Sequence, residues 1–414
     1  MSNRYKIYTL GCKVNQYDSA SLGSELEKKG FKSVDNQADW VIVNTCAVTK
    51  IAIRKGRQML TKARRENPEA SIILMGCWPK AYSELKSEMK ADYIFTVGEA
   101  PKIINLIIKE SKKIDIEPKS DNKIISTDRS RYFIKIQDGC EQFCSYCIIP
   151  YTRGKLKSRN ENEILVEITR AIQAGYPEIV LSGIHLGLFG QEKGENRLVP
   201  LIKNILKIEG LGRIRLSSIE VTEISDELIN LIRDNDKFCR HLHIPLQAGT
   251  DKILKLMNRP YDTKYFADKI KKLREEIPDI AITNDVIVGF PGETEADFEQ
   301  TCEFIWENKF SKSHIFSFSA HEKTPAFNMP NQVDPQEIKR RSDELHKIGT
   351  QLQEEYQNKF KNKKLKVVVE REKGGNLKGK TEYFFDVFFS KKQIISKQNI
   401  EDKIYNNLIE IENI

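Results

Sequence analysis

Short apolar stretches that alternate with helical stretches constrain the fold of this chain more than any other feature of its sequence. Within residues 1–112, four runs rich in β-branched and apolar side chains stand out, at 7–10, 40–43, 72–75 and 93–97. Continuous apolar runs of this length are typical of parallel strands that are covered on both faces. The pattern therefore predicts an N-terminal α/β domain with a doubly wound parallel sheet over residues 1–112.

Helical stretches separate these predicted strands. The first helix is expected to begin near Asp18 or Ser19, which are good N-cap residues, and to stop at Gly30. The second carries a run of basic residues and is expected to end before Pro68. In doubly wound sheets, ligands bind outside the carboxyl ends of the strands, so the residues that follow the strands are candidate site residues.

Cysteines occupy these positions. Cys12, Cys46 and Cys77 follow the first, second and third predicted strands. Because parallel strands end at one edge of a sheet, the three thiolates are expected to converge there and to hold one [4Fe–4S] cluster with one iron left open. The alternative is that these cysteines are small buried hydrophobic residues, which is the ordinary role of a single free cysteine.

A second α/β region is predicted over residues 131–358, after a polar linker at 113–130 that contains Pro118. The predicted strands are 132–136, 179–182, 214–217, 242–245, 281–288 and 315–318. Strands joined by helices in this way suggest a (β/α)6 partial barrel. Its site is expected at the carboxyl ends of the strands, as in complete (β/α)8 barrels.

A second cysteine triplet follows the first strand of this region. Cys140, Cys144 and Cys147 form a C-x-x-x-C-x-x-C motif, which can hold three irons of a [4Fe–4S] cluster and leave the fourth iron free for a substrate molecule. A zinc site is the alternative, but it would need a fourth ligand nearby, and the next histidine is His185. Cys239 and Cys302 have no matching partners and are expected to lie in the core.

Composition agrees with a globular protein of two or three domains, since the chain has 414 residues of which 39% are hydrophobic. We find no apolar run of about 18 residues and no apolar stretch at the start of the chain, so neither a membrane span nor a secretory signal is indicated. A cytoplasmic location is expected. Thiols stay reduced there and are available to bind metal.

The charge distribution suggests contact with phosphates. The net charge of +8 arises from 67 basic and 59 acidic residues, which is a modest excess. Basic residues are nevertheless concentrated in the second predicted helix and near the C-terminus. The candidate RNA-binding residues are Arg54, Lys55, Arg57, Arg64, Arg65, Lys363 and Lys364. A merely solvated helix face is the alternative for these residues.

The motif around the second triplet resembles the cluster loop of the radical S-adenosylmethionine (SAM) enzymes, including the aromatic Tyr146 before the third cysteine. The flanking sequence CIIPYTRG, residues 147–154, is similar to that of the methylthiotransferases within that group. The segments TLGCKVNQYDS, VNTCAV and MGC, which contain the first three cysteines, resemble the cluster-binding segments of the same family's N-terminal domain.

This resemblance implies two [4Fe–4S] clusters and SAM as cofactors. The cluster at Cys140, Cys144 and Cys147 would reduce and cleave SAM to a radical, and the N-terminal cluster would hold the sulfur that a second SAM methylates. The implied SAM contacts are Tyr146, Ser182, Gly183, His185, Ser218, Glu220, Gln247, Asp285 and Gly289. For His185 and Glu220, a structural hydrogen-bonding role is the alternative.

The resemblance also implies partners, namely a tRNA substrate, a low-potential electron donor and a sulfur source. Lys13 and Val14 in the first segment favour the branch that acts on N6-threonylcarbamoyladenosine beside the anticodon. The alternatives are relatives that act on isopentenyladenosine in tRNA or on an aspartate of a ribosomal protein. An alternative of another class is a non-catalytic iron–sulfur protein that binds RNA or senses redox state.

Two segments depart from the family pattern. Residues 319–326 read SAHEKTPA where the family usually has SxRxGTPA, so a role of this loop in substrate contact is in doubt. Residues 359–414 resemble the TRAM domain, a small RNA-binding β-barrel, only weakly and are expected to be a degenerate version of it. Strands are expected at 367–370 and 383–387, with residues 379–383, GKTEY, resembling that domain's GxTxxY element.

Overall fold

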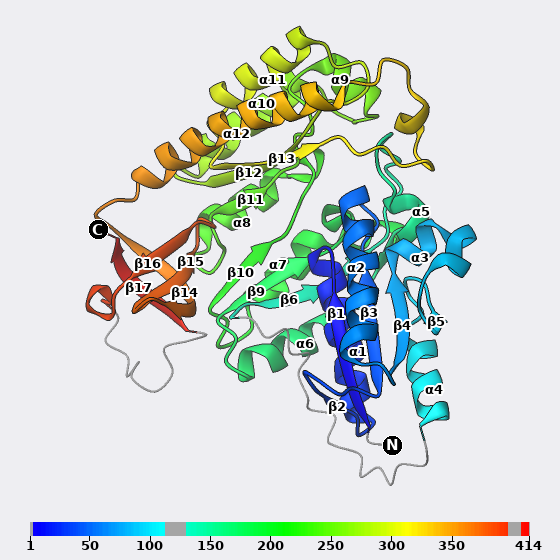
Figure 1. The fold of residues 1–414 in the computed structure, drawn as a ribbon. Coiled ribbons are helices and arrows are strands. Elements are labelled where there is room, and N and C mark those ends of the chain that lie inside the picture. The colour runs from blue at the N-terminus through cyan, green and yellow to red at the C-terminus, as the bar shows by residue number, and fades with distance from the viewer. Residues whose placement is uncertain (1–2, 112–129, 396–406, 414) are drawn as a thin grey trace. The chain divides into compact units, whose positions relative to one another are not determined.

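The computed structural model describes residues 3–111, 130–395 and 407–413, and these form two compact units (Figure 1). Unit 1 combines Met1–Thr127 with two segments from later in the chain, Asp138–Lys155 and Ser319–Phe327. Unit 2 comprises the rest of the chain. The predicted linker at 113–130 lies almost entirely outside the described residues.

Unit 1 contains the parallel sheet that the sequence predicts. Its strand order is β2-β1-β3-β4-β5. The strands are β1 (Arg4–Thr9), β2 (Lys32–Ser33), β3 (Trp40–Thr45), β4 (Ser71–Gly76) and β5 (Tyr93–Ile94). The helices are α1 (Lys13–Lys28), α2 (Lys50–Glu66), α3 (Cys77–Ala81), α4 (Ala100–Glu110) and α5 (Ile149–Arg153). Strand β5 is shorter than the expected 93–97.

Alternate residues of the central strands face two separate cores. Val41 and Val43 pack into a core with Leu60 of α2, whereas Ile42 packs into another core with Leu26 of α1. Helices therefore cover both faces of the sheet, which explains why these strands are apolar throughout. The doubly wound arrangement predicted from the sequence is confirmed.

The expected start of the first helix is wrong. Helix α1 begins at Lys13 with Cys12 as its N-cap, not near Asp18 or Ser19. Ser19 instead lies inside the helix, where its Oγ accepts hydrogen bonds from Thr9 Oγ1 at 2.8 Å and from Asn44 Nδ2 at 3.0 Å. The sequence pattern misleads because good capping residues serve here in buried contacts between helix and sheet.

Unit 2 contains the predicted partial barrel as two three-stranded parallel sheets, ordered β10-β9-β6 and β11-β12-β13. Isolated parallel bridges, Ile214 to Phe238 and Ser218 to His243, connect the two sheets. The barrel strands are β6 (Tyr132–Lys135), β9 (Glu178–Ser182), β10 (Arg213–Leu216), β11 (His241–His243), β12 (Ala281–Val288) and β13 (Lys312–Ser317). Two short strands, β7 (Gln137–Asp138) and β8 (Lys157–Ser158), pair with each other in a separate sheet.

Helices follow the barrel strands along the chain. They are α6 (Glu161–Gln173), α7 (Leu198–Leu206), α8 (Asp226–Asp234), α9 (Asp251–Leu256), α10 (Thr263–Glu276), α11 (Glu295–Glu307) and α12 (Pro335–Asn358). The 3-10 helices of the chain are η1 (Ser83–Glu88), η2 (Leu186–Leu188), η3 (Gln191–Lys193), η4 (Val221–Glu223), η5 (Pro325–Asn328) and η6 (Lys391–Gln393). Cys239 is buried as expected, whereas Cys302 is only half-buried.

The C-terminal part of unit 2 is an antiparallel sheet with the order β16-β15-β14-β17. Its strands are β14 (Lys363–Lys373), β15 (Asn376–Thr381), β16 (Asp386–Phe389) and β17 (Leu408–Asn413). The strand expected at 383–387 begins only at Asp386, because residues 382–384 form a turn and Phe384 has a φ of +69°. A strand cannot continue through that left-handed conformation.

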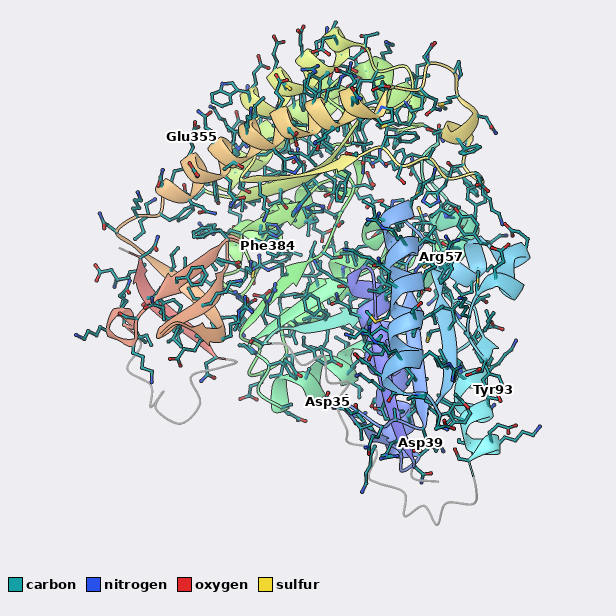
Figure 2. All side chains as sticks on the ribbon, in the orientation of Figure 1. Asp35, Asp39, Arg57, Tyr93, Glu355 and Phe384 are labelled. Carbon is teal, nitrogen blue, oxygen red and sulfur yellow. The ribbon has the colours of Figure 1, made fainter. Side chains whose placement is uncertain are left out.

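Two arginines of β10 dock this sheet onto the barrel. Arg213 donates to the carbonyl oxygens of Lys366 and Lys380 at 2.9 and 2.8 Å, and Arg215 donates to the Thr381 carbonyl at 2.9 Å. The ring of Phe384 stacks on His241 of β11 with centroids 4.3 Å apart, and Figure 2 shows Phe384 pointing from the C-terminal sheet towards the barrel strands.

Candidate functional site

Cys12, Cys46 and Cys77 lie at one edge of the sheet of unit 1. Cys12 caps α1 just after β1, while Cys46 and Cys77 directly follow β3 and β4. The last residues of β3 and β4, Thr45 and Gly76, are partners in the strand register, so Cys46 and Cys77 leave the sheet next to each other. The structure thus brings together the three cysteines that the sequence analysis singled out.

The loop before Cys12 approaches Cys46 closely. Gly11 has a φ of +109°, and a Cβ atom placed there would lie only 2.8 Å from the Cβ of Cys46. Buried Asn15 ties the neighbouring strand ends together, because its Nδ2 donates to the carbonyl oxygens of Leu10 and Thr45 at 2.8 and 3.1 Å. Only glycine permits this approach, so residue 11 helps to hold Cys12 beside Cys46.

Burial controls the protonation of these thiols. It raises the pKa of Cys46, and it raises the pKa of Cys77 to about 12, an effect that the positive charge of Arg153 opposes. Without a metal, both thiols are therefore protonated at neutral pH. Iron binding requires the thiolate, so ligation would release these protons and would gain from a nearby cation.

The second triplet belongs to the same compact unit, within Asp138–Lys155. The Cys140 amide donates to the Gly154 carbonyl at 3.0 Å, and the Cys147 amide donates to the Cys144 carbonyl at 2.9 Å. Next to Cys147, Ile148 is only 2% exposed and packs into the core between the sheet and α2. Unit 1 therefore supplies both cysteine triplets, although they are far apart in the sequence.

Close backbone contact closes the loop of the second triplet. Gly139 has a φ of +75°, and a Cβ atom there would lie 1.8 Å from the carbonyl oxygen of Lys155. Phe143 also has a positive φ, +49°, and its half-exposed ring lies edge-on to Tyr151 at 6.0 Å. Such strained conformations are common where a loop clamps a ligand.

One side chain, Arg153, joins this loop to α1. Its Nη1 donates to both carboxylate oxygens of Asp138 at 2.8 Å, and its Nη2 donates to Asn15 Oδ1 at 2.5 Å and to Asp18 Oδ2 at 3.1 Å. The side chain is only 1% exposed. The sequence analysis did not select Arg153, although the residue is part of the CIIPYTRG segment that carried the resemblance.

The segment Ser319–Phe327, which departs from the family pattern, packs against the same unit. His321 is 1% exposed, and its Nε2 and Nδ1 lie 2.8 Å from the Val48 carbonyl oxygen and 3.2 Å from the Tyr82 hydroxyl oxygen. Burial lowers the pKa of His321, so the ring is neutral at neutral pH. The histidine that replaces the family's arginine therefore has a packing role in unit 1.

Two further contacts hold this segment. Lys323, at the position of the family's glycine, pairs with Glu84 at 2.8 Å. The Ala326 amide donates to the carbonyl of Ser145 at 2.8 Å, between the second and third cysteines of the central triplet. The segment therefore contacts the cysteine loop within unit 1, although it comes from much later in the chain.

The donor set of the N-terminal triplet fits an iron–sulfur cluster. Within residues 3–111, 130–395 and 407–413, no three histidine, cysteine, aspartate or glutamate side chains are placed to share one ion. A zinc site needs ligands that converge in this way. In a [4Fe–4S] cluster each thiolate binds a different iron, so three thiols that follow neighbouring strand ends fit that group.

The carboxyl end of β9 in unit 2 carries several of the expected SAM contacts. His185 is 7% exposed, its Nε2 lies 2.5 Å from Glu223 Oε1, and its amide donates to Gln137 Oε1 at 2.8 Å. A Cβ atom at Gly183 would lie 3.1 Å from the same Gln137 oxygen. Glu223 and Gln137 therefore orient the His185 ring and backbone, and the sequence offered no signal for either.

Glu220 follows β10 and pairs with Arg259, whose side chain is 2% exposed. Burial raises the pKa of Glu220, and the Arg259 charge opposes this shift. Arg259 also donates from Nε to the Tyr261 hydroxyl group at 3.1 Å. The sequence analysis missed Arg259, because it lies 39 positions after Glu220 and no local pattern indicates that the two residues pair.

Two hydroxyl groups near these strand ends have unused hydrogen-bonding capacity. The Oγ atoms of Ser182 and Ser217 are buried and have no hydrogen-bond partner. Buried polar atoms of this kind usually mark a bound ligand or water. SAM carries amino, carboxylate and hydroxyl groups that could pair with them, so the residues at this end of unit 2 fit the expected cofactor.

The other expected SAM contacts lie on the second sheet of the barrel. Gln247 has a φ of +70°, and its amide donates to the Asp285 carbonyl at 2.8 Å. The Asp285 carboxylate accepts from His243 Nε2 at 3.2 Å. Ser218 forms a parallel bridge to His243, which the sequence analysis did not select. These residues are thus neighbours around the end of β11 and the middle of β12.

Gly289 and Tyr146 are less clearly placed for SAM. A Cβ atom at Gly289 would lie 2.3 Å from the Ile338 side chain, so packing against α12 already requires glycine there. Tyr146 is half-buried in the cysteine loop of unit 1. Their contact with SAM stays a prediction.

The predicted RNA-binding residues differ in their surroundings. Arg54, Lys55, Arg57 and Arg65 are exposed on α2, and Figure 2 shows Arg57 on that helix. Arg64 instead binds Asp92 through two contacts of 2.9 and 2.7 Å. On the C-terminal sheet, Lys364 lies opposite Glu412 in the strand register, and Lys363 lies 3.8 Å from Asp279. The exposed face of α2 is the stronger candidate for phosphate contact.

No helix among the described residues is long and apolar enough to cross a membrane.

Comparisons with known proteins show that two regions match family models. Residues 134–305 match the radical SAM superfamily, and residues 4–96 match a family described as uncharacterized protein family UPF0004. The first region contains the central triplet, and the second contains Cys12, Cys46 and Cys77.

Several curated relatives are similar over most of their length. The chain is 37% identical to the threonylcarbamoyladenosine tRNA methylthiotransferase MtaB of Bacillus subtilis, covering 88% of this chain and 84% of the relative. It is 36% identical to MtaB of Thermotoga maritima, covering 92% and 89%. It is also 36% identical to the tRNA-2-methylthio-N(6)-dimethylallyladenosine synthase of Thermoanaerobacter pseudethanolicus, covering 88% and 82%.

Solved structures show a related fold. The radical SAM methyltransferase TsrM from Kitasatospora setae matches with a TM-score of 0.60 over 79% of this chain and 77% of its own. The sequence identity is 13%, so this similarity concerns the fold alone.

Proposed function

The chain belongs to the radical SAM tRNA methylthiotransferase family, and from that premise we propose that it converts N6-threonylcarbamoyladenosine in tRNA, at position 37 beside the anticodon, to the 2-methylthio derivative. The relatives named for threonylcarbamoyladenosine and for dimethylallyladenosine are almost equally similar in overall identity. The choice therefore rests on the segment around Cys12, where Lys13 and Val14 resemble the threonylcarbamoyladenosine branch.

Radical SAM enzymes use SAM and a [4Fe–4S] cluster, and Cys140, Cys144 and Cys147 would hold that cluster here. We further propose a second cluster at Cys12, Cys46 and Cys77. The observation that carries this proposal is that both cysteine triplets belong to one compact unit. When bound, these groups supply the radical and the sulfur that are needed to replace an unactivated aromatic C–H bond by C–S, which no side chain can supply.

The chain's own residues prepare the site for this chemistry. In unit 2, Glu223 fixes the His185 ring, and Arg259 pairs with the half-buried carboxylate of Glu220. Orphaned Ser182 Oγ is available to a ligand. Fixed polar groups of this kind can orient SAM without reorganisation when it binds. In unit 1, the loop contacts of Gly139 hold the central triplet in place.

Contact with tRNA is proposed for the exposed basic face of α2. Arg54, Lys55 and Arg65 are exposed there, and no ion pair within the described residues engages them. Free cationic groups on one helix face can neutralise RNA phosphates and release counterions. The reaction also needs a low-potential electron donor and a source of sulfur as partners, which the chain must recognise in turn.

The proposed substrate can be tested by mass spectrometry of tRNA nucleosides from a strain that lacks this gene. The proposal expects 2-methylthio-N6-threonylcarbamoyladenosine to disappear and unmodified N6-threonylcarbamoyladenosine to accumulate. Loss of the methylthio group from isopentenyladenosine instead would assign the other tRNA substrate. Loss from neither nucleoside would contradict a role in tRNA modification.

Complementation separates catalysis from other roles of the protein. The parent gene and a Cys302→Ala variant should restore the modified nucleoside, because Cys302 belongs to neither triplet. A Cys144→Ala variant should not restore it. Restoration by Cys144→Ala would favour the alternative of a non-catalytic iron–sulfur protein, and so would failure of the reduced protein to cleave SAM.

A further inference from the structure

Arg153 has an unused hydrogen-bond donor beside the N-terminal cysteines. Its Nε atom is buried and has no hydrogen-bond partner, although Nη1 and Nη2 bind Asp138, Asn15 and Asp18. A buried donor without a partner has lost its hydrogen bonds to water, which destabilises the fold. Such an atom calls for an explanation, and a bound group or an ordered water is one.

The guanidinium group lies beside the segments that carry the N-terminal triplet. Its Nη2 donates to Asn15 Oδ1 at 2.5 Å, and Asn15 Nδ2 in turn donates to the carbonyl oxygens of Leu10 and Thr45, just before Cys12 and Cys46. Helix α5, which ends at Arg153, packs against α3, which begins at Cys77. The charge of Arg153 therefore acts on the triplet at short range. Since the side chain is 1% exposed, water screens this interaction little. The ion pairs with Asp138 and Asp18 prevent the group from turning towards solvent.

Arg4 provides an internal comparison. It also has a buried Nε without a hydrogen-bond partner, and it pairs with Asp39 at 3.5 Å. Arg4 begins β1, however, and Asp39 immediately precedes β3, so this pair lies at the end of the sheet away from the cysteines; Figure 2 labels Asp39 there. An unpaired Nε alone therefore marks no site. The neighbouring thiols distinguish Arg153.

We propose that Arg153 Nε donates a hydrogen bond to a sulfur atom of the cluster held by Cys12, Cys46 and Cys77, and that Arg153 thereby sets the reduction potential of this cluster. The inference rests on the second cluster of the proposed function. Reduction adds negative charge to a cluster, and a hydrogen bond from a cation stabilises that charge. Arg153 is thus a positioning residue that makes the N-terminal cluster easier to reduce.

The test isolates the N-terminal cluster in the full-length chain. Replacing Cys140, Cys144 and Cys147 by alanine leaves one triplet, and iron and midpoint potential are then measured without SAM or tRNA. Arg153→Lys keeps the charge but removes the Nε donor. The expected result is unchanged iron content and a lower midpoint potential. The reduction equilibrium should change on the order of tenfold, which is about 59 mV for a one-electron couple. Arg4→Lys is the matched control and should leave the potential unchanged.

A second measurement keeps the inference testable if Arg153→Lys fails to fold. The protein with Cys140, Cys144 and Cys147 replaced by alanine is labelled with 15N at arginine Nε and reduced, and pulsed electron paramagnetic resonance is recorded. A hydrogen bond to cluster sulfur should give a weak 15N coupling that persists in Arg4→Lys. Absence of any arginine coupling would overturn the proposal.

The outcomes distinguish this inference from the proposed function. Iron binding by the single-triplet protein with the same potential in the parent and in Arg153→Lys would overturn the role of Arg153 and leave the second cluster intact. No iron in the single-triplet protein would overturn both. A negative result for methylthiolation of threonylcarbamoyladenosine would concern the substrate only, because these measurements contain no tRNA.

Discussion

Replacing Glu178 by glutamine is expected to destabilise unit 2 and loosen its C-terminal sheet. Glu178 begins β9 and is fully buried. Its carboxylate accepts from Arg213 Nε at 2.6 Å and from Arg215 Nε at 2.9 Å, and Arg131 Nη1 lies 3.7 Å away. The same two β10 arginines hold the backbone carbonyls of the C-terminal sheet.

The magnitude follows from the burial of these charges. Removing one partner of a buried ion pair costs about 3–5 kcal/mol, because the remaining charge is left in a poorly solvated site. Here the Arg213 and Arg215 side chains are 3% and 0% exposed, so water cannot replace the lost carboxylate. The glutamine amide can accept only through its oxygen, and its NH2 group would face another donor.

Urea unfolding followed by circular dichroism measures the loss, and hydrogen exchange of the β15 amides reports docking of the C-terminal sheet. Glu178→Gln should lower the free energy of unfolding by about 3–5 kcal/mol and speed exchange in β15. The control is Glu227→Gln, which removes an exposed pair with Lys203 and should change little. Breaking an exposed ion pair lowers the free energy of unfolding by no more than about 1 kcal/mol. A loss below that value for Glu178→Gln, together with unchanged exchange in β15, would refute the reasoning.

The pH dependence gives an independent check. Burial by itself would raise the pKa of Glu178, but the positive charges of Arg213, Arg215 and Arg131 outweigh it and hold the pKa below its usual range. A carboxylate with a lowered folded-state pKa stabilises the fold above its unfolded pKa, about 4.3, and loses this effect as the pH falls through the folded value. The difference between parent and Glu178→Gln should therefore persist from pH 5 to 8 and shrink only in acid.

Three further predictions concern the clusters and the RNA partner. Anaerobically reconstituted protein should hold about eight irons, and Cys144→Ala should lose about half of them, as measured by iron analysis; an unchanged iron content would exclude the central triplet as a cluster site. Replacing all three N-terminal cysteines by alanine should leave reductive formation of 5′-deoxyadenosine but abolish methylthio product, and product at the parental rate would show that this triplet is not the sulfur site. Affinity for tRNA should fall with salt with a log–log slope of roughly 0.7 to 0.9 per neutralised phosphate. Converting Arg54, Lys55 and Arg65 to glutamine should weaken binding and flatten this slope more than Arg64→Gln, whose parent side chain is held by Asp92; equal effects, or none, would contradict the assignment of the α2 face.

Local sequence patterns determined the parallel strands and the cysteine positions. The strand at Ala281–Val288 was predicted to the residue, and Cys46 and Cys77 follow their strands directly. These features depend on side-chain periodicity and on short spacings, which act over a few neighbouring residues. The class of fold follows from them, because apolar strands joined by helices can be buried in few ways.

Capping and turn signals were less reliable. The predicted start of α1 was wrong because Ser19 does not cap the helix. Its side chain makes a buried contact with Thr9 of the sheet. The strand expected from residue 383 begins only at Asp386, because Phe384 adopts a left-handed conformation and stacks on His241 of a distant strand. In both places a long-range contact overrides the local preference.

Only the tertiary structure decided which charged groups meet. Arg153 reaches Asp18 across 135 residues of sequence, and Glu178 pairs with Arg215 across 37. Lys364 lies opposite Glu412, a pairing that weakens the case for phosphate contact there. Charge is visible in a sequence, but the partner of a buried charge depends on how distant segments pack, and packing is set by the whole chain. For that reason the sequence could single out the candidate cysteine ligands, whereas the residues packed around them emerged only from the fold.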